Sequence, residues 1–289
     1  MSYELLSKLY YKNKTLFNEE YERRKNGIYS VSLGVSIHGA EGFYVNLPDF
    51  LIEMTNIYKK SAELEKLCAK LPTAAYDSYA RKCLVDEIIL SNDMEGIRST
   101  RKEILSVLNE DRQKPRKKRF QGMVHKYVML LAEDTGLHGF SLHTPEDVRQ
   151  LYDEFVLDEI AEADHPDGKL FRKEIAQVIS GTQQVKHTGL FPEAEIISSM
   201  EKTLEIFERP EIPALYKIAI FHYMIGYIHP FYDGNGRLSR FISSYLLKQE
   251  FNTLVALRLS YSIKDRKNDY YKAFDTEMCI RDRFWIKQG

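Results

Sequence analysis

The sequence has few cysteines. Its 289 residues include three, Cys68, Cys83 and Cys279, and no two of them form a Cys-x-x-Cys pair. An odd number of widely separated cysteines argues against a framework of paired disulfides. We therefore expect the chain to work in a reducing compartment, and we predict a cytoplasmic location.

Long apolar runs are also absent. No segment approaches the roughly 20 apolar residues that a membrane helix needs. The first residues, Met1 to Tyr11, lack the apolar core of a signal peptide. We therefore expect no membrane partner.

The sequence has no excess of charge of either sign. Lys and Arg number 41 and Asp and Glu 42, for a formal net charge of -1, which argues against a globally basic nucleic-acid binder. The one basic concentration is Arg112 to Arg119, with six cations interrupted by Gln113 and Pro115. A nucleic-acid tract usually adds aromatic platforms, and only Phe120 follows, so a solvated loop between helices is favoured. We expect no nucleic-acid partner within this chain.

Most of the chain has apolar residues at helical spacing. We predict helices over residues 49–71, 74–92, 120–131, 213–228 and 238–246. Thr144-Pro145-Glu146-Asp147 is a helix start, because a capping hydroxyl precedes Pro and acids of the first turn. Residues 28–37 alternate as a strand does, and residues 171–193 suit a β-hairpin. These patterns indicate a mostly α protein.

The strongest candidates for a functional site are residues 229–237, His-Pro-Phe-Tyr-Asp-Gly-Asn-Gly-Arg, between the last two predicted helices. Pro230 disfavours helical geometry at His229, so a loop must begin there. Gly234 and Gly236 permit close backbone approach. A helix that starts near Asn235 points unpaired N-H groups at whatever lies before it, and such a helix end binds anions.

Charged side chains surround this predicted anion site. Arg237 and Arg240 lie three residues apart on one helix face and can hold phosphate oxygens. Asp233 supplies the hard oxygen that Mg2+ takes beside substrate phosphates. His229, with a reference pKa of about 6.5, can accept a proton near neutral pH. A polyphosphate beside a base is the arrangement that these residues favour.

Each feature alone has an ordinary structural explanation. A His before Pro can be a helix end, Gly-Asn-Gly a turn, and two arginines three apart a solvated face. Together, however, the residues resemble the signature of the Fic family, His-Pro-Phe-x-Asp/Glu-Gly-Asn-Gly-Arg-x-x-Arg, which residues 229–240 match without a departure. The resemblance extends over roughly residues 75–275.

This resemblance implies a Fic-fold helical core and a protein adenylyltransferase, which transfers AMP from ATP to a Ser, Thr or Tyr hydroxyl and releases pyrophosphate. It implies that His229 deprotonates the hydroxyl and that Asp233 holds Mg2+ bridging the α- and β-phosphates. The phosphates would be bound by the remaining polar residues of the signature: Gly234, Asn235, Gly236, Arg237 and Arg240. Catalysis would rest on positioning and charge neutralisation. Phe231 is expected to anchor the loop in the core.

The end of the predicted helix at residues 74–96 carries a second resemblance. Ser91-Asn92-Asp93-Met94-Glu95-Gly96 resembles the Ser/Thr-x-x-x-Glu-Gly/Asn inhibitory motif of a subset of Fic proteins. Glu and Gly are also ordinary at a helix end. The family role would pair Glu95 with the second signature arginine, Arg240, and so keep the γ-phosphate from binding productively.

Other candidate residues lie outside the signature. In Fic proteins a hairpin, the flap, covers the nucleotide and pairs its backbone with the target protein; here we predict it at Val185, Lys186, His187 and Thr188. Tyr270 and Tyr271 resemble a tyrosine pair that lies against adenine and ribose, although a core role for one is open. His222, seven residues before His229, could form a metal pair with it; a structural role is favoured.

We therefore predict an N-terminal region at residues 1–115 with its inhibitory helix, a Fic core at residues 116–277 and an atypical tail at residues 278–289. The tail resembles a translated adapter rather than a Fic sequence. The predicted partner is a protein substrate bound at the flap, and self-modification is a further expectation. Two alternatives stay open: removal of AMP by the same site, alone or with transfer, and a nucleotide-binding protein without catalysis. Phosphoryl and phosphocholine transfer occur in relatives whose sequences depart from the signature at positions where this chain retains the signature residue.

Overall fold

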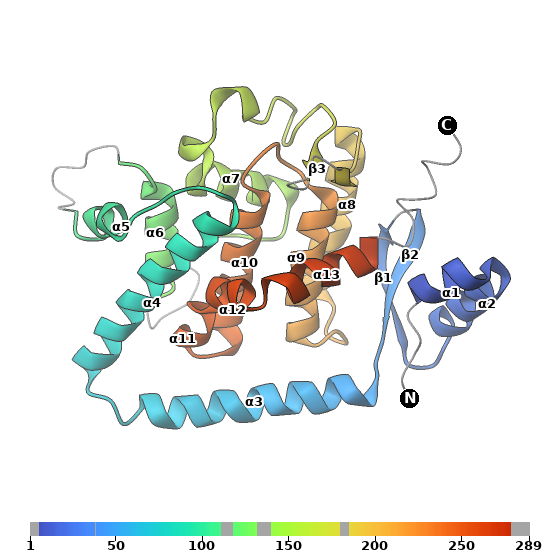
Figure 1. The fold of residues 1–289 in the computed structure, drawn as a ribbon, viewed down its shortest axis with the longest axis horizontal. Helices are drawn as coiled ribbons and strands as arrows, with labels where there is room; N and C mark the ends of the chain where they lie inside the picture. Colours follow the sequence, from blue (N-terminus) through green and yellow to red (C-terminus); the bar gives the residue numbers. More distant parts are fainter. Residues whose placement is uncertain (1–5, 38, 111–117, 132–139, 180–184, 279–289) are drawn as a thin grey trace. The chain divides into compact units, whose positions relative to one another are not determined.

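The computed structural model describes residues 6–37, 39–110, 118–131, 140–179 and 185–278. These residues are mostly helical, and the strands among them form two small two-stranded sheets (Figure 1). The predicted fold class, a helical core with a small hairpin and an N-terminal extension, is confirmed. Much of the basic segment, and all of the predicted tail at residues 278–289 except Met278, lie outside the described residues.

The chain divides into two compact units. The first consists of the described residues of 1–59, 178–187 and 268–289, and the second of those of 60–177 and 188–267. The whole signature, residues 229–240, belongs to the second unit. The two units are therefore described separately.

The first unit begins with two short helices and a hairpin. Its elements are α1 (Leu6–Lys12), α2 (Lys14–Lys25), β1 (Ser30–Ile37), β2 (Ala40–Val45), the first half of α3 (Pro48–Cys68) and nearly all of α13 (Lys267–Met278). β1 and β2 are antiparallel, with Ser30 opposite Val45 and Ile37 opposite Ala40. The predicted strand at residues 28–37 is confirmed. Helices α1 and α2 were not predicted, because their residues are aromatic and charged without a clear apolar stripe.

The second unit contains the helices around the signature. They are α4 (Thr73–Met94), α5 (Arg101–Leu108), α6 (Gln121–Met129), α7 (Pro145–Phe155), α8 (Glu193–Glu205), α9 (Ala214–Ile228), α10 (Asn235–Glu250), α11 (Thr253–Ala256) and α12 (Leu259–Asp265), with short 3-10 turns at Leu157–Glu159, Glu162–Asp164 and Ile206–Glu208. The predicted helices are confirmed, with ends within a few residues. The expected start of α7 is a capping box in which the Thr144 hydroxyl accepts from the Asp147 N-H.

Helices α9 and α10 pack against each other at the centre of this unit (Figure 1). Both carry apolar residues at helical spacing, and Phe221 and Phe241 are buried. The Phe241 ring stacks on Phe155 of α7, with centroids 4.6 Å apart, and meets Tyr127 of α6 edge-on at 5.0 Å. Truncation of a buried Phe costs about 3–5 kcal/mol. This packing fixes α10, and with it the arginines on its first turns.

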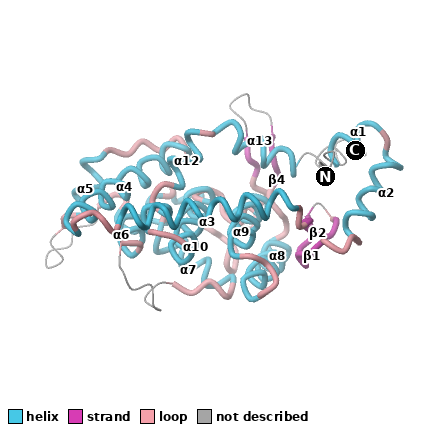
Figure 2. The backbone as a smooth tube through the Cα atoms, turned by 90° about the horizontal axis from the view of Figure 1, so that it is seen from below, coloured by secondary structure: helices cyan, strands magenta, loops and turns pink. Residues whose placement is uncertain are grey.

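Two further elements bear on the predicted site. β3 (Gln177–Ile179) and β4 (Val185–Thr188) pair as a two-stranded sheet, so the predicted hairpin is confirmed, although its strands are short. α12 packs along α4 (Figure 2). No helix within the described ranges combines the length and apolar character that crossing a membrane would require.

Candidate functional site

The junction between α9 and α10 is a sharp loop that opens with a strained residue. His229 adopts the left-handed conformation, with φ 50° and ψ 61°, while its N-H still donates to Ile225 O at 3.0 Å. Such a conformation costs a non-glycine residue about 1–3 kcal/mol. Gly234, with φ 83°, ends the loop just before α10 begins at Asn235. The predicted loop and the predicted helix start are confirmed.

The side chain of Asn235 holds the loop rather than facing a ligand. Its Oδ1 accepts from Phe231 N at 3.0 Å and its Nδ2 donates to Phe231 O at 2.8 Å. Phe231 is fully buried, and its ring stacks on Tyr152 with centroids 3.6 Å apart. The Tyr152 hydroxyl in turn donates to Asp233 O at 3.1 Å. Asn235 can therefore serve a phosphate only through its backbone N-H, and Phe231 is the expected core anchor.

Arg237 is a buried cation with unused donors. Its side chain has no exposed surface, and its Nη2 donates to Asp233 Oδ2 at 3.2 Å. Among the described residues, Nε and Nη1 of this guanidinium have no hydrogen-bond partner. A buried donor without a partner costs about 1–3 kcal/mol or more when charged, so native proteins seldom leave one without a ligand. These two buried donors at the start of α10 could bind an anion, as the sequence predicts.

Asp233 is the carboxylate of the loop that can reach solvent. Its side chain is 46% exposed, and its Oδ1 accepts from the Gly234 N-H. Within the described ranges, no three or more His, Cys, Asp or Glu side chains gather into a metal site. A magnesium ion at Asp233 would therefore take its other ligands from phosphate oxygens and water, as Mg2+ commonly does.

Arg240 is held by the end of α4. Its Nε donates to Ser91 Oγ at 2.9 Å, and its Nη2 donates to Ser91 O at 2.8 Å. The same Nη2 lies 2.7 Å from Glu95 Oε1, while Arg240 is almost fully buried and the Glu95 side chain is 30% exposed. The first and fifth residues of the motif at residues 91–96 thus both contact the second arginine of the signature. Figure 1 shows the C-terminal end of α4 beside the start of α10.

The Glu95 carboxylate also packs against the backbone of the signature. A Cβ added to Gly236 would lie 2.1 Å from Glu95 Oε1, so this close approach requires glycine at that position. Gly236 lies in the first turn of α10, where the helix dipole favours negative charge. Glu95 therefore places a carboxylate at the same helix end that the sequence predicts for phosphate.

The end of α4 is fixed on both sides of Glu95. The helix stops at Met94, and Gly96 follows with φ 72°, which is the usual glycine stop. Asp93 pairs with Lys264 of α12 at 2.6 Å. About two turns earlier on α4, the buried Glu87 accepts from Ser260 N, and burial raises the pKa of Glu87 to about 7. The Glu95 side chain is thus presented by an anchored helix end.

His222 has contacts that suit a structural histidine. Its Nδ1 lies 2.9 Å from Ser243 Oγ and 3.0 Å from Ser239 Oγ. Burial, with a smaller effect of the Arg240 charge, lowers the pKa of His222 to about 4. The ring is neutral at pH 7 and bonded to hydroxyls of α10, which supports the structural role over a metal pair with His229.

The remaining predicted site residues lie on two elements. Val185, Lys186, His187 and Thr188 make up β4, and of these only His187 is buried. Tyr270 and Tyr271 are neighbours on α13, with ring centroids 5.2 Å apart. Of these six residues, all but Thr188 belong to the first unit. Their contacts with a nucleotide stay predictions.

One site residue was missed by sequence reasoning. Arg172 is fully buried, and its Nε donates to His229 O at 2.8 Å. Its only signal in the sequence is a charged residue directly after the apolar pair Leu170-Phe171. Nothing local to residues 170–172 shows that the arginine contacts a loop almost sixty positions later.

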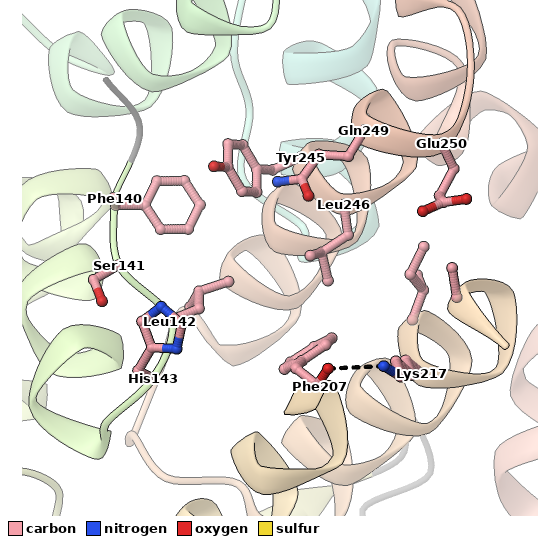
Figure 3. A pocket seen from close by; sticks show the side chains of 12 residues that line it. Phe140, Ser141, Leu142, His143, Phe207, Lys217, Tyr245, Leu246, Gln249 and Glu250 are labelled. Carbon is pink, nitrogen blue, oxygen red and sulfur yellow. Dashed lines mark hydrogen bonds between the residues drawn. The ribbon is translucent and has the colours of Figure 1, made fainter. Parts of the chain in front are cut away.

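A separate cavity lies away from the signature. It has a volume of about 360 Å3 and is lined by apolar side chains such as Phe140, Tyr245 and Leu246, with Lys217 and Glu250 among its polar residues (Figure 3). The Lys217 amine donates to Phe207 O at 2.7 Å. No residue of the signature lines this cavity, so the cavity is not the predicted anion site.

Comparison with known proteins finds similarity to one family. Residues 134–247 match the model of the Fic/DOC family. A Fic family protein from Desulfovibrio desulfuricans G20 has a similar fold, with a TM-score of 0.58 and 18% identity over 85% of this chain and 77% of that chain.

Two further solved structures match with lower scores. A Fic domain containing signaling protein from Bacteroides thetaiotaomicron VPI-5482 has a TM-score of 0.49 and 17% identity over 66% of this chain and 72% of that one. A fragment of Fic-1 from C. elegans has a TM-score of 0.46 and 15% identity over 81% of this chain and 72% of that one.

Proposed function

This chain contains a domain of the Fic/DOC family, and on that basis we propose that it is an autoinhibited protein adenylyltransferase. Members of this family typically modify proteins, by transfer of AMP or of a related group. The reaction proposed here is transfer of AMP from ATP to a Ser, Thr or Tyr hydroxyl of a target protein, with release of pyrophosphate. The observation that supports it most is the pair of buried Arg237 donors that have no partner in the described part of the chain.

The residues around Arg237 fit a magnesium nucleotide. The Arg237 donors are available to an anion, the glycine at position 236 permits close approach of a charged group to the backbone, and α10 begins beside them with its N-terminal N-H groups. Asp233, exposed and next to Arg237, would hold the metal. When bound, Mg2+ would neutralise charge on the α- and β-phosphates.

His229 is the base in this proposal. The target hydroxyl oxygen would bond to the α-phosphorus as the bond from that phosphorus to pyrophosphate breaks, and His229 would accept the hydroxyl proton. The left-handed turn at His229 opens the loop that leads to the proposed anion site. The protein supplies position and charge, which are the main contributions in transfer at phosphorus.

Autoinhibition in this proposal rests on Glu95. The Arg240 guanidinium that would bind the γ-phosphate is bonded to Ser91 and paired with Glu95 at 2.7 Å. A carboxylate at that position repels a phosphate and occupies its donors. ATP would therefore bind in a non-productive way until Glu95 moves. The target protein is proposed to pair its backbone with the β3–β4 hairpin, as extended peptides pair with sheet edges.

One observation favours a second activity of the same site. The Glu95 carboxylate is partly exposed beside the proposed phosphate site. In that position it could orient a water molecule against AMP on a modified target, so that the site would remove AMP as well as add it. Release of free AMP from a modified protein, lost in a Glu95→Gly variant, would support this second activity.

Labelled ATP tests the proposal directly. The protein is incubated with ATP labelled at the α- or at the γ-phosphate, and self-modification is followed on a gel. Transfer of the α-label only, absent in a His229→Ala variant, is the expected result. Transfer of the γ-label would show phosphoryl transfer instead. Tight ATP binding without any transfer, also in a Glu95→Gly variant, would favour a nucleotide-binding protein without catalysis.

A further inference from the structure

Arg172 is a buried cation that the proposed reaction does not use. It lies in the segment between the 3-10 turn that ends at Asp164 and β3, and it has no exposed surface. Among the described residues, no Asp or Glu side chain forms an ion pair with its guanidinium. A buried arginine without a carboxylate must have its charge satisfied by other groups, because an unpaired buried charge is costly.

Backbone carbonyls accept the hydrogen bonds of Arg172, and three of these carbonyls belong to consecutive residues. Nη2 of Arg172 lies 3.5 Å from Ile228 O, Nε donates to His229 O at 2.8 Å, and the backbone N-H donates to Pro230 O at 3.2 Å. These carbonyls leave the end of α9, where the last turn has no helical donors. A cation at a helix C-terminus is favourable for the same reason.

The guanidinium also ties this turn to neighbouring segments. Nη1 donates to Glu174 O at 2.5 Å and Nη2 donates to Leu190 O at 2.7 Å. The position of a Cβ on Gly189 would lie 2.4 Å from Arg172 Nη2 and 2.8 Å from His229 Cβ. Gly189 therefore lets the guanidinium pack directly beside the residue that carries the imidazole.

These contacts explain why the turn at His229 is stable. The left-handed conformation of His229 is unfavourable by itself, and Pro230 adds no N-H that could hold it. The planar fork of Arg172 reaches the carbonyl of His229 and the carbonyl of Ile228 just before it, while the Pro230 carbonyl accepts from the Arg172 backbone N-H. A lysine ammonium is a single point with three donors on a flexible stem and cannot reproduce that geometry.

We propose that Arg172 is a positioning residue that sets the left-handed turn of His229, and with it the direction of the imidazole. This inference rests on the proposed function, because it takes His229 as the base. Arg172 does not touch the predicted phosphate site, whose side chains are Asp233, Arg237 and Arg240. Its loss should therefore reduce turnover and leave nucleotide binding unchanged.

The test compares Arg172→Met and Arg172→Lys in a Glu95→Gly background. A matched control is Arg149→Met, because Arg149 also donates to a carbonyl of this segment, Leu170 O at 2.8 Å, and does not touch the signature loop. Three quantities are measured: kcat for AMP transfer, KM and the dissociation constant for ATP, and the 13C shifts of His229 in histidine-labelled protein. The His229 signal is assigned by its absence from a His229→Ala variant.

We expect kcat of both Arg172 variants to fall on the order of 100-fold, because misplacement of a catalytic group by about 1 Å can have an effect of that size. Their KM and dissociation constant for ATP should stay as in the control, and the His229 shifts should move away from those of a left-handed residue. A folded Arg172→Lys variant with unchanged kcat and shifts would overturn the proposal. So would an equal loss of ATP affinity, or failure of both variants to fold, since Arg172 would then hold the whole domain.

The two hypotheses can fail separately. If the Glu95→Gly protein transfers no AMP, the proposed function fails, and the His229 shifts still test the positioning. If that protein is active and the Arg172 variants match it in kcat and in shifts, only the positioning fails.

Discussion

Oε1 of Glu95 lies 2.7 Å from Nη2 of Arg240, although the two residues are 145 positions apart in the chain. The pair joins the end of α4 to the first turns of α10. The same carboxylate packs against Gly236, so it occupies the helix end that the signature offers to an anion. This contact makes Glu95 the most informative residue to change.

Glu95→Gly should raise self-modification with α-labelled ATP. A charge-assisted hydrogen bond is worth about 1.5–3 kcal/mol, so its removal should increase transfer by about 10- to 100-fold. Glu95→Gln is the matched variant, because it keeps the size of the side chain and removes the charge; it should activate less than glycine and more than wild type. Unchanged transfer by both variants would leave residues 91–96 as an ordinary helix end.

Arg240→Ala should lower activity with and without Glu95. Without the guanidinium the γ-phosphate loses a bidentate partner, so KM for ATP should rise in the wild-type and in the Glu95→Gly background. Titration of ATP in transfer assays measures this change. An Arg240→Ala variant as active as Glu95→Gly would mean that Arg240 only holds the inhibitory contact and does not bind substrate.

His229→Ala should abolish transfer while ATP still binds. A positioned general base contributes about 100- to 10,000-fold to rate, and no phosphate contact depends on the imidazole in our proposal. The measurement pairs the α-label assay with ATP binding by calorimetry, both in the Glu95→Gly background. His222→Asn is a useful comparison, because His222 bonds hydroxyls of α10 and not the loop. Transfer that survives His229→Ala would remove the base assignment.

Asp233→Ala should lose magnesium-dependent ATP binding and activity together. Asp233 is the only carboxylate within the signature, and its side chain is open to solvent. The variant also frees Nη2 of Arg237, so binding of ATP without metal should be kept. Calorimetric titrations with and without Mg2+ separate the two effects, with Asp265→Ala as an exposed carboxylate control on α12. An unchanged Mg2+ titration would place the metal elsewhere.

Glu87→Gln should stabilise the protein at pH 8 relative to wild type and have little effect near pH 4. Burial raises the pKa of Glu87 from 4.5 to about 7. Between these two pKa values the folded state binds more protons than the unfolded state. The free energy of unfolding of the wild type therefore falls as pH rises through this range, and the contribution of Glu87 becomes constant above it. The difference can reach about 3 kcal/mol at high pH, since one pKa unit corresponds to about 1.4 kcal/mol.

Urea unfolding of wild type and Glu87→Gln at a series of pH values measures this difference directly. Because only residue 87 differs, the titration of other groups cancels between the two proteins. A difference in stability that does not grow between about pH 4.5 and 7 would show that Glu87 is ionised in the folded protein at low pH, held by Ser260 and the Arg240 charge.

Much of the local structure could be predicted from the sequence. The start of α10 at Asn235 follows from Gly234, the break at His229 follows from Pro230, and the end of α4 follows from Gly96. These are decided by conformational preferences of neighbouring residues, which are local and strong for glycine and proline. The short helices α1 and α2 escaped prediction because no apolar stripe marks them.

The family signature was recognisable for a related reason: its residues are consecutive. A base, a carboxylate, two glycines and two arginines fall within residues 229–240, so their chemistry could be interpreted together without knowing the fold. Arg237 and Arg240 share a helix face because of helical periodicity alone. The full burial of Arg237, however, depends on the helices that pack around it. So does the lack of partners, among the described residues, for two of its hydrogen-bond donors.

The long-range contacts were decided only by the tertiary structure. By itself the sequence determined the helices with a clear apolar stripe, the loop at residues 229–234 and the set of reactive groups, because short-range preferences act between neighbours. The burial of Arg172 beside His229 and the bonds between Arg240 and Ser91 arise when the segment before β3 packs on the end of α9 and α4 packs on α10. Packing joins residues without regard to their separation in the chain, so only the folded molecule shows which carbonyls need the Arg172 donors.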